Sequence, residues 1–140
     1  MPVALIGHCI AQITNKELVV AGGFSSDTND YNAVTYIYNL VEMTWKTKNW
    51  MSLRFGPRMD SNCLAMQLNN EKKIILVGGW NNSAIPETEM FDRRSEKWIG
   101  MKKNISDTEQ QPSMSQSIRS SALAFLNQKL ILAGGVKCSG

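Results

Sequence analysis

The feature that most constrains this sequence is a recurring pattern of four aliphatic residues followed by two glycines. The pattern occupies residues 18–23, 74–79 and 130–135, so both intervals are 56 residues. Equal spacing of this kind indicates a fold built from repeated supersecondary units. The glycine pairs that anchor the pattern are Gly22-Gly23, Gly78-Gly79 and Gly134-Gly135.

Each unit is predicted to be a four-stranded antiparallel meander. A second apolar stretch precedes each glycine pattern, at residues 9–13, 63–68 and 122–126, and a short polar turn separates the two. Short, nearly continuous apolar runs are typical of strands buried on both faces, which requires sheets stacked on sheets. The glycine pair ends the second strand, where a side chain would block a neighbouring backbone or a positive φ is needed.

The third and fourth strands are predicted from a pattern of aromatic residues that occurs twice. In each copy an aromatic residue precedes Asn or Asp, and a tryptophan follows six residues later. Asn or Asp suits the turn between the two strands, and the tryptophan offers a large apolar area for packing between sheets. The copies are Tyr38-Asn39 with Trp45, and Phe91-Asp92 with Trp98.

Together these residues resemble the kelch repeat, which forms the blades of β-propellers. The resemblance implies an all-β fold, a partial and open kelch β-propeller of four-stranded antiparallel blades, since closed propellers have four to eight blades. The remaining blades would come from the same chain or from self-association. The expected divisions are blade 1 at 6–50, blade 2 at 58–101, an inter-blade loop at 102–118 and half of blade 3 at 119–140.

Kelch domains of ubiquitin-ligase adaptors bind partners where the innermost strand of each blade starts, with arginines and small polar groups. The resemblance therefore implies partner contacts from Arg119 with Ser120, from Arg58 with Asn62, and from His8. Because the guanidinium group is a planar fork of donors, we expect a protein partner with an acidic or carbonyl-rich segment. Equally open is a structural role in which Arg119 ties a loop to a neighbouring blade.

The expected function is a protein-interaction module, either a substrate receptor of a ubiquitin ligase or a cytoskeletal adaptor. One alternative is a fragment of a kelch-type propeller enzyme similar to galactose oxidase, and another is a purely structural fragment. A copper site needs at least two imidazoles, and His8 is the single histidine. Serine hydrolysis is not indicated either, because the sequence has no Gly-x-Ser-x-Gly motif that would supply a nucleophile for His8. We therefore expect no catalytic residue, metal or cofactor within this sequence.

Charge and cysteine content bear on partners and location. Fifteen basic and twelve acidic residues give a net charge of +3, too small for a nucleic-acid footprint. No apolar stretch approaches the roughly 20 residues of a membrane helix, and no signal peptide is evident. Cys9, Cys63 and Cys138 are odd in number and far apart, which predicts reduced thiols and a cytoplasmic protein. The glycosylation sequons at Asn81 and Asn104 weakly oppose that location.

Overall fold

The structure, a computed structural model, describes residues 1–101, 118–127 and 129–137. Within these ranges every regular element is a β-strand and every strand pair is antiparallel. The predicted all-β class is therefore confirmed. No helix in the described ranges has the length and apolar character needed to cross a membrane. The predicted loop at 102–118 falls, apart from its last residue, outside the described residues.

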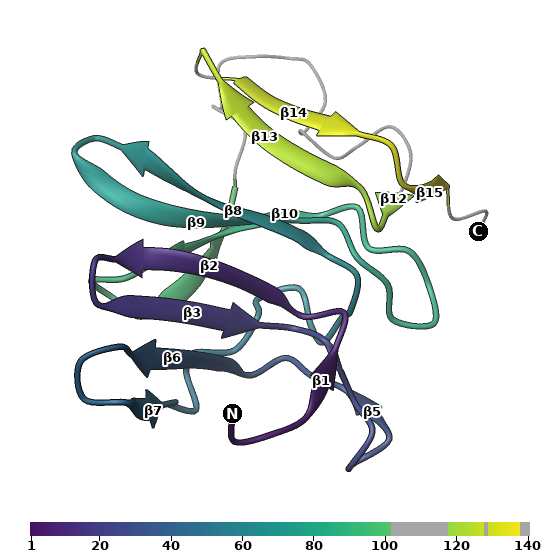
Figure 1. Ribbon diagram of the computed structural model, residues 1–140. Helices are drawn as coiled ribbons and strands as arrows, with labels where there is room; N and C mark the ends of the chain where they lie inside the picture. The colour runs from purple at the N-terminus through teal and green to yellow at the C-terminus, as the bar shows by residue number, and fades with distance from the viewer. Residues whose placement is uncertain (102–117, 128, 138–140) are drawn as a thin grey trace.

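Two four-stranded sheets share one strand order, as the sequence predicts. The N-terminal sheet has the order β2-β3-β6-β7, and the central sheet has the order β8-β9-β10-β11 (Figure 1). The strands of the N-terminal sheet are β2 (Cys9–Thr14), β3 (Glu17–Ala21), β6 (Thr35–Asn39) and β7 (Thr44–Lys46). Those of the central sheet are β8 (Asn62–Leu68), β9 (Glu71–Val77), β10 (Thr88–Asp92) and β11 (Lys97–Gly100).

The third glycine pattern lies at the end of a C-terminal hairpin formed by β13 (Ala122–Leu126) and β14 (Lys129–Ala133). Figure 1 shows the central sheet between this hairpin and the N-terminal sheet, and β8 neighbours both β2 and β13. Two small sheets lie at the strand ends. One contains β1 (Leu5–Ile6), β4 (Phe24–Ser25) and β5 (Asp30–Tyr31), and the other contains β12 (Ile118–Arg119) and β15 (Val136–Lys137).

The glycine pairs have the backbone conformation that the sequence predicts for them. All six glycines have positive φ, between 66° and 122°. Close approach matters as well, because a Cβ on Gly22 would lie 2.7 Å from the carbonyl oxygen of Arg58. A Cβ on Gly79 would lie 2.4 Å from Oγ of Ser61. Both physical reasons for glycine therefore apply at the first and second glycine pairs.

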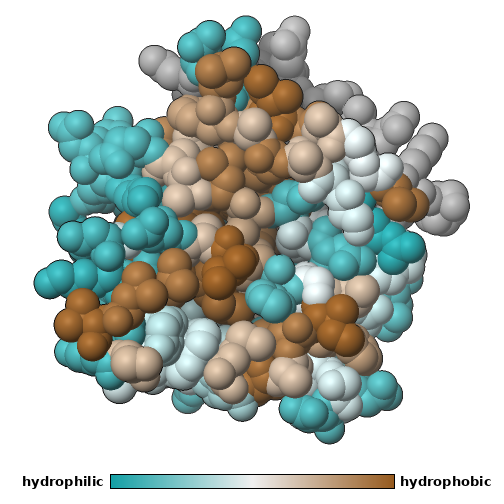
Figure 2. All heavy atoms as spheres, viewed as in Figure 1, coloured by the Kyte–Doolittle hydropathy of each residue, from teal (hydrophilic) through white to brown (hydrophobic). Residues whose placement is uncertain are grey.

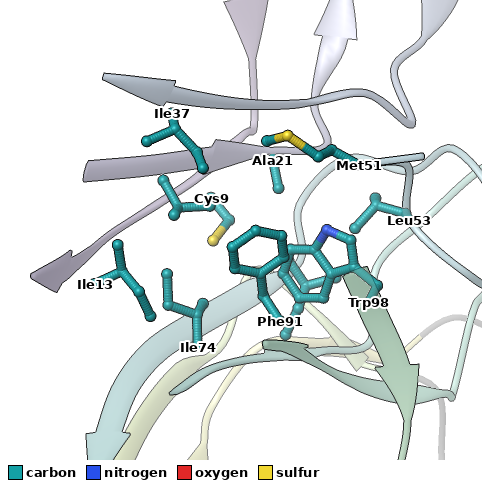
Figure 3. Close-up of a cluster of buried hydrophobic side chains, with 11 residues drawn as sticks. Cys9, Ile13, Ala21, Ile37, Met51, Leu53, Ile74, Phe91 and Trp98 are labelled. Carbon is teal, nitrogen blue, oxygen red and sulfur yellow. The ribbon is translucent and has the colours of Figure 1, made fainter. Parts of the chain in front are cut away.

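The main core lies between the N-terminal and central sheets (Figure 3). Phe91 and Trp98 of the central sheet point toward the N-terminal sheet, and their ring centroids are 5.3 Å apart. The indole Nε1–H of Trp98 donates a hydrogen bond to Oγ1 of Thr35 at 2.8 Å. The second tryptophan of the repeat pattern thus packs between adjacent sheets, as predicted, and its polar group is satisfied.

The prediction of reduced thiols is wrong for two of the three cysteines. Cys9 of β2 and Cys63 of β8 form a disulfide, with their Cα atoms 5.8 Å apart. The two cysteines are 54 residues apart, so they do not occupy equivalent places in the 56-residue repeat. Their contact arises because the first strands of neighbouring sheets lie side by side, which spacing alone does not show. Cys138 lies outside the described residues.

Ion pairs also join the N-terminal and central sheets, at the strand ends that lie away from the disulfide. Arg93 donates two hydrogen bonds to the carboxylate of Glu17, at 2.8 and 2.9 Å, and one to Glu96 at 3.0 Å. Lys46 of the N-terminal sheet also contacts Glu96. The hydrogen bonds from Arg93 hold the pKa of Glu17 below its ordinary value. Here basic and acidic residues are paired with one another, as expected of partly solvated hairpin ends.

Candidate functional site

The first strands of the three repeat units are β2, β8 and β13. The strand register shows which residues are equivalent at the start of these strands. In each unit, the residue just before the glycine pair is matched with the first residue of β2, β8 or β13. The matched pairs are Ala21 with Cys9, Val77 with Asn62, and Ala133 with Ala122. Two residues before each first strand therefore lie Gly7, Asp60 and Ser120, which we call the rim residues.

A chain of backbone hydrogen bonds connects the three rim residues. Their φ angles are 64°, 55° and 55°, so all three adopt the left-handed conformation. The N–H of Asp60 donates to the carbonyl of Gly7 at 2.8 Å, and the N–H of Ser120 donates to the carbonyl of Asp60 at 3.1 Å. These bonds fix the spacing between the starts of the first strands. Sequence reasoning missed this chain, because Gly, Asp and Ser share only a preference for turns.

Arg119 lies in β12, next to the rim residue Ser120. Its guanidinium carbon is 5.0 Å from the centroid of the Trp80 ring, and its Nη1 is 4.0 Å from Oδ2 of Asp60. The side chain of Arg119 is 35% exposed. A cation held over an aromatic face is attracted by the ring quadrupole, so Trp80 orients the guanidinium group. Sequence reasoning did not single out Trp80, which lies outside the repeated aromatic pattern and directly follows the second glycine pair.

Arg58 requires a correction, because it does not lie at the surface. Met59 pairs with Trp80 as Arg119 pairs with Val136, so Met59 is the equivalent of Arg119. Arg58 is one position away, and its side chain points to the other side of the backbone. Arg58 is 0% exposed and forms an ion pair with Glu89, which is also 0% exposed. Its Nη1 donates to the carbonyls of Gly78 at 3.0 Å and Glu87 at 3.2 Å.

The buried ion pair has a structural role. Burial lowers the pKa of Arg58 to about 10, so the side chain is still protonated at neutral pH. The other oxygen of the Glu89 carboxylate, Oε2, accepts the backbone N–H of Arg54 at 2.7 Å. Arg58 thus links the loop before β8 to both β10 and the second glycine pair. The predicted partner contact of Arg58 is replaced by this internal one.

The other predicted site residues are only partly brought together. Ser120 is exposed beside Arg119. Asn62 donates from Nδ2 to Oγ of Ser121 at 2.6 Å, which ties the central sheet to the C-terminal hairpin. Nδ1 of His8 lies 3.1 Å from the carbonyl oxygen of Leu5, within its own unit. The structure therefore assembles Arg119, Ser120, Asp60 and Trp80 as the candidate site, which we call the Arg119 site.

The Arg119 site brings one cation and one carboxylate together at the rim, with Arg119 Nη1 4.0 Å from Oδ2 of Asp60. It combines a planar cation, an aromatic face and an exposed hydroxyl group. In residues 1–101, 118–127 and 129–137, no three His, Cys, Asp or Glu side chains are grouped as metal binding would require. No model of a known protein family matches the chain. The resemblance to kelch repeats therefore rests on the glycine pairs and the aromatic–tryptophan spacing alone.

Proposed function

We propose that this chain is a protein-interaction module, an open arc of kelch-type propeller blades that binds an acidic segment of a partner protein at the Arg119 site. Substrate receptors of ubiquitin ligases and cytoskeletal adaptors both work by such binding. In this proposal the two four-stranded sheets are complete blades and the C-terminal hairpin is half of a third. The function is recognition, and no bond of the partner is made or broken.

The observation that carries the proposal is the state of the Arg119 guanidinium group. Among the described residues, its nearest carboxylate oxygen is Oδ2 of Asp60, 4.0 Å away and beyond the range of a direct hydrogen bond. By contrast, Arg93 and Arg94 each contact a carboxylate oxygen within the chain, at 2.8 and 2.6 Å. Within the part of the chain that the structure describes, Arg119 therefore keeps donors for an incoming carboxylate, while Trp80 holds it in place. Such preorganisation lowers the entropic cost of binding.

Four structural features support the kelch-type arrangement. The two complete sheets have the same strand order, and the three glycine pairs have the same left-handed conformation. An aromatic–tryptophan pair lies in each complete sheet, with centroids 4.7 Å apart for Tyr38–Trp45 and 5.3 Å for Phe91–Trp98. The first strand of the central sheet neighbours the first strands of the other two units, which is the arrangement around a propeller axis.

Selection of displayed peptides on the wild-type chain, followed by affinity measurement, tests the proposal. We expect the selected peptides to contain Asp or Glu. Replacing Arg119 by Ala should weaken their binding by about 10- to 100-fold, since a hydrogen-bonded charge pair contributes about 1.5–3 kcal/mol. Arg119→Lys should bind with intermediate affinity, because an ammonium group lacks the planar fork.

Two further variants provide the controls. Arg94→Ala removes an 84% exposed arginine at the other end of the strands and should leave affinity unchanged. Asp60→Asn removes the competing carboxylate beside Arg119 and should strengthen the binding of acidic peptides. Selected peptides without acidic residues would overturn the proposal. Equal affinities for wild type and Arg119→Ala would do the same.

A further inference from the structure

The two ends of the stack of sheets expose apolar faces that correspond to faces buried inside it. Inside the stack, the face of the central sheet with Phe91 and Trp98 packs on the N-terminal sheet, and the two residues are 0% and 5% exposed. The receiving face of the N-terminal sheet includes Cys9, Ile13 and Val19. This buried contact has two different sides, and the exposed faces at the two ends of the stack can each be compared with one of them.

The N-terminal end presents a second aromatic face. Tyr38 and Trp45 are the equivalents of Phe91 and Trp98, and they share a face with Ile10 and Val20, turned away from the central sheet. The residues before β2, including Leu5, cover part of this face. Tyr38 and Trp45 remain half-buried, and Ile10 is 56% exposed. We call this surface the aromatic end face.

The C-terminal end presents a face of the receiving kind. Leu123 and Phe125 of the hairpin pack toward the central sheet, so Ala124 and its strand partner Ile131 face away from it. Ile131 is the third residue before its glycine pair, as Val19 and Ile75 are before theirs. The exposed fractions are 0% for Val19, 0% for Ile75 and 45% for Ile131. We call this surface, which also includes Leu126 at 60%, the receiving end face.

We propose that the aromatic end face of one copy of this chain packs on the receiving end face of a second copy. The chain already contains one example of this contact, between the central and N-terminal sheets, so the two end faces have matching chemistry. Figure 2 shows apolar side chains at the surface both over the hairpin and over the N-terminal sheet. Exposed apolar side chains that gather on one face mark interaction sites, and Ile10, Ile131 and Leu126 are 56%, 45% and 60% exposed. The contact is head-to-tail, and its two sides are different surfaces.

Sedimentation analysis of the purified 140-residue chain tests the proposal. We expect the average mass to rise above the 15.6 kDa of one chain as concentration increases through the micromolar range. Ile10→Arg on the aromatic end face and Ile131→Arg on the receiving end face should each abolish this rise. Mixing the two variants should restore a 1:1 dimer that grows no further, because each variant keeps the face that the other has lost.

The mixing experiment separates this contact from other kinds of association. A contact between two identical surfaces would leave one of the single variants dimeric and would not be restored by mixing. Val41→Arg, in the turn after β6, changes a residue that is 66% exposed and lies outside both end faces, so its association should match that of wild type. Circular dichroism of each variant checks folding. A wild-type chain that stays monomeric, or aggregation that the two variants do not affect, would overturn the proposal.

Discussion

The N-terminal and central units have the same backbone arrangement, but at two equivalent positions one unit has apolar residues and the other has charged residues. In the N-terminal unit, Leu5 packs with Tyr36 and Val20 in an apolar cluster. The strand register makes Arg58 the equivalent of Leu5 and Glu89 the equivalent of Tyr36. The apolar contact of the first unit is therefore an ion pair in the second, and Arg58 and Glu89 are both 0% exposed.

Both positions differ between the two units, so each residue is matched to its neighbour within its own unit. A single charged residue here would be buried without a partner, which is far more costly than either matched pair. The ion pair also does something that the apolar pair does not. Arg58 donates to the carbonyl of Gly78 and so connects the loop before β8 to the second glycine pair.

Breaking the ion pair is expected to have the largest effect on stability. Arg58→Leu leaves the Glu89 carboxylate buried without its cation, and Glu89→Tyr leaves the Arg58 guanidinium buried without its anion. Each single variant should lower the free energy of unfolding by about 3–5 kcal/mol. Urea denaturation followed by tryptophan fluorescence measures the loss. A loss below about 1 kcal/mol, the scale of an exposed ion pair, would contradict the interpretation.

The double variant Arg58→Leu/Glu89→Tyr sharpens the comparison, because it transfers the Leu5–Tyr36 pair into the central unit. It should recover most of the stability lost by either single variant, since matched apolar pairs can replace buried ion pairs with little cost. Losses that simply add in the double variant would show that the two units are not interchangeable at this point.

The two junctions between units differ in a second way, and reduction of the disulfide tests it. Cys9–Cys63 joins the first strands of the N-terminal and central sheets, whereas the Asn62–Ser121 hydrogen bond joins the central sheet to the hairpin. For a sequence separation of 54 residues, reduction should lower the free energy of unfolding by about 4 kcal/mol. Denaturation with and without reductant measures this value, and the Cys9→Ser/Cys63→Ser variant should not respond to reductant.

At the second junction, Asn62→Ala should lower the free energy of unfolding by only about 1 kcal/mol.

Glycine substitutions compare the first and third glycine pairs. A Cβ on Gly22 would meet the carbonyl of Arg58, whereas a Cβ on Gly134 would meet no heavy atom of the described residues within 4 Å. Both residues have positive φ, at 69° and 72°. Gly134→Ala should therefore cost about 1–2 kcal/mol of backbone strain, and Gly22→Ala about 3 kcal/mol because overpacking adds to it. Thermal unfolding of the two variants compares them, and equal losses would contradict a contact between units at Gly22.

The sequence predicts the sheets well because three kinds of residue have fixed places within each repeat. The glycine pair ends the second strand, since it needs positive φ, and the aromatic and tryptophan positions place the outer strands. The prediction for the turn after the third strand is also confirmed. Asn39 accepts the backbone N–H groups of Val41 and Glu42, and Asp92 accepts that of Ser95.

Three features of the site and the core are not predicted by the sequence, because they depend on exact strand register or on which residues of different units meet. The disulfide joins positions that are not equivalent in the repeat, so the period gives no sign of it. Arg58 and Arg119 look alike in sequence, but one position in register sends one side chain inside and the other to the rim. Trp80 belongs to no repeated pattern, and its role depends on Arg119 from the next unit.

The smallest expected effect concerns Asp92, whose equivalent in the N-terminal sheet is Asn39. Burial raises the pKa of Asp92, but hydrogen bonds from Lys73 and Ser95 outweigh it and hold the pKa below its ordinary value of 3.8. The ionised Asp92 carboxylate therefore stabilises the folded state when the pH is above that ordinary pKa. This stabilisation is lost as the pH falls through the lower pKa of the folded state.

Asp92→Asn reproduces the residue of the N-terminal sheet and keeps the turn acceptor while removing the charge. It should lower the free energy of unfolding by about 1 kcal/mol at neutral pH, because the contact with Lys73 loses its charge. The difference from wild type should shrink steadily in acid, as Asp92 itself becomes protonated. Urea denaturation at a series of pH values measures it. A difference that persists unchanged in strong acid would assign the effect to the turn, and the two sheets would then differ there in shape and not in charge.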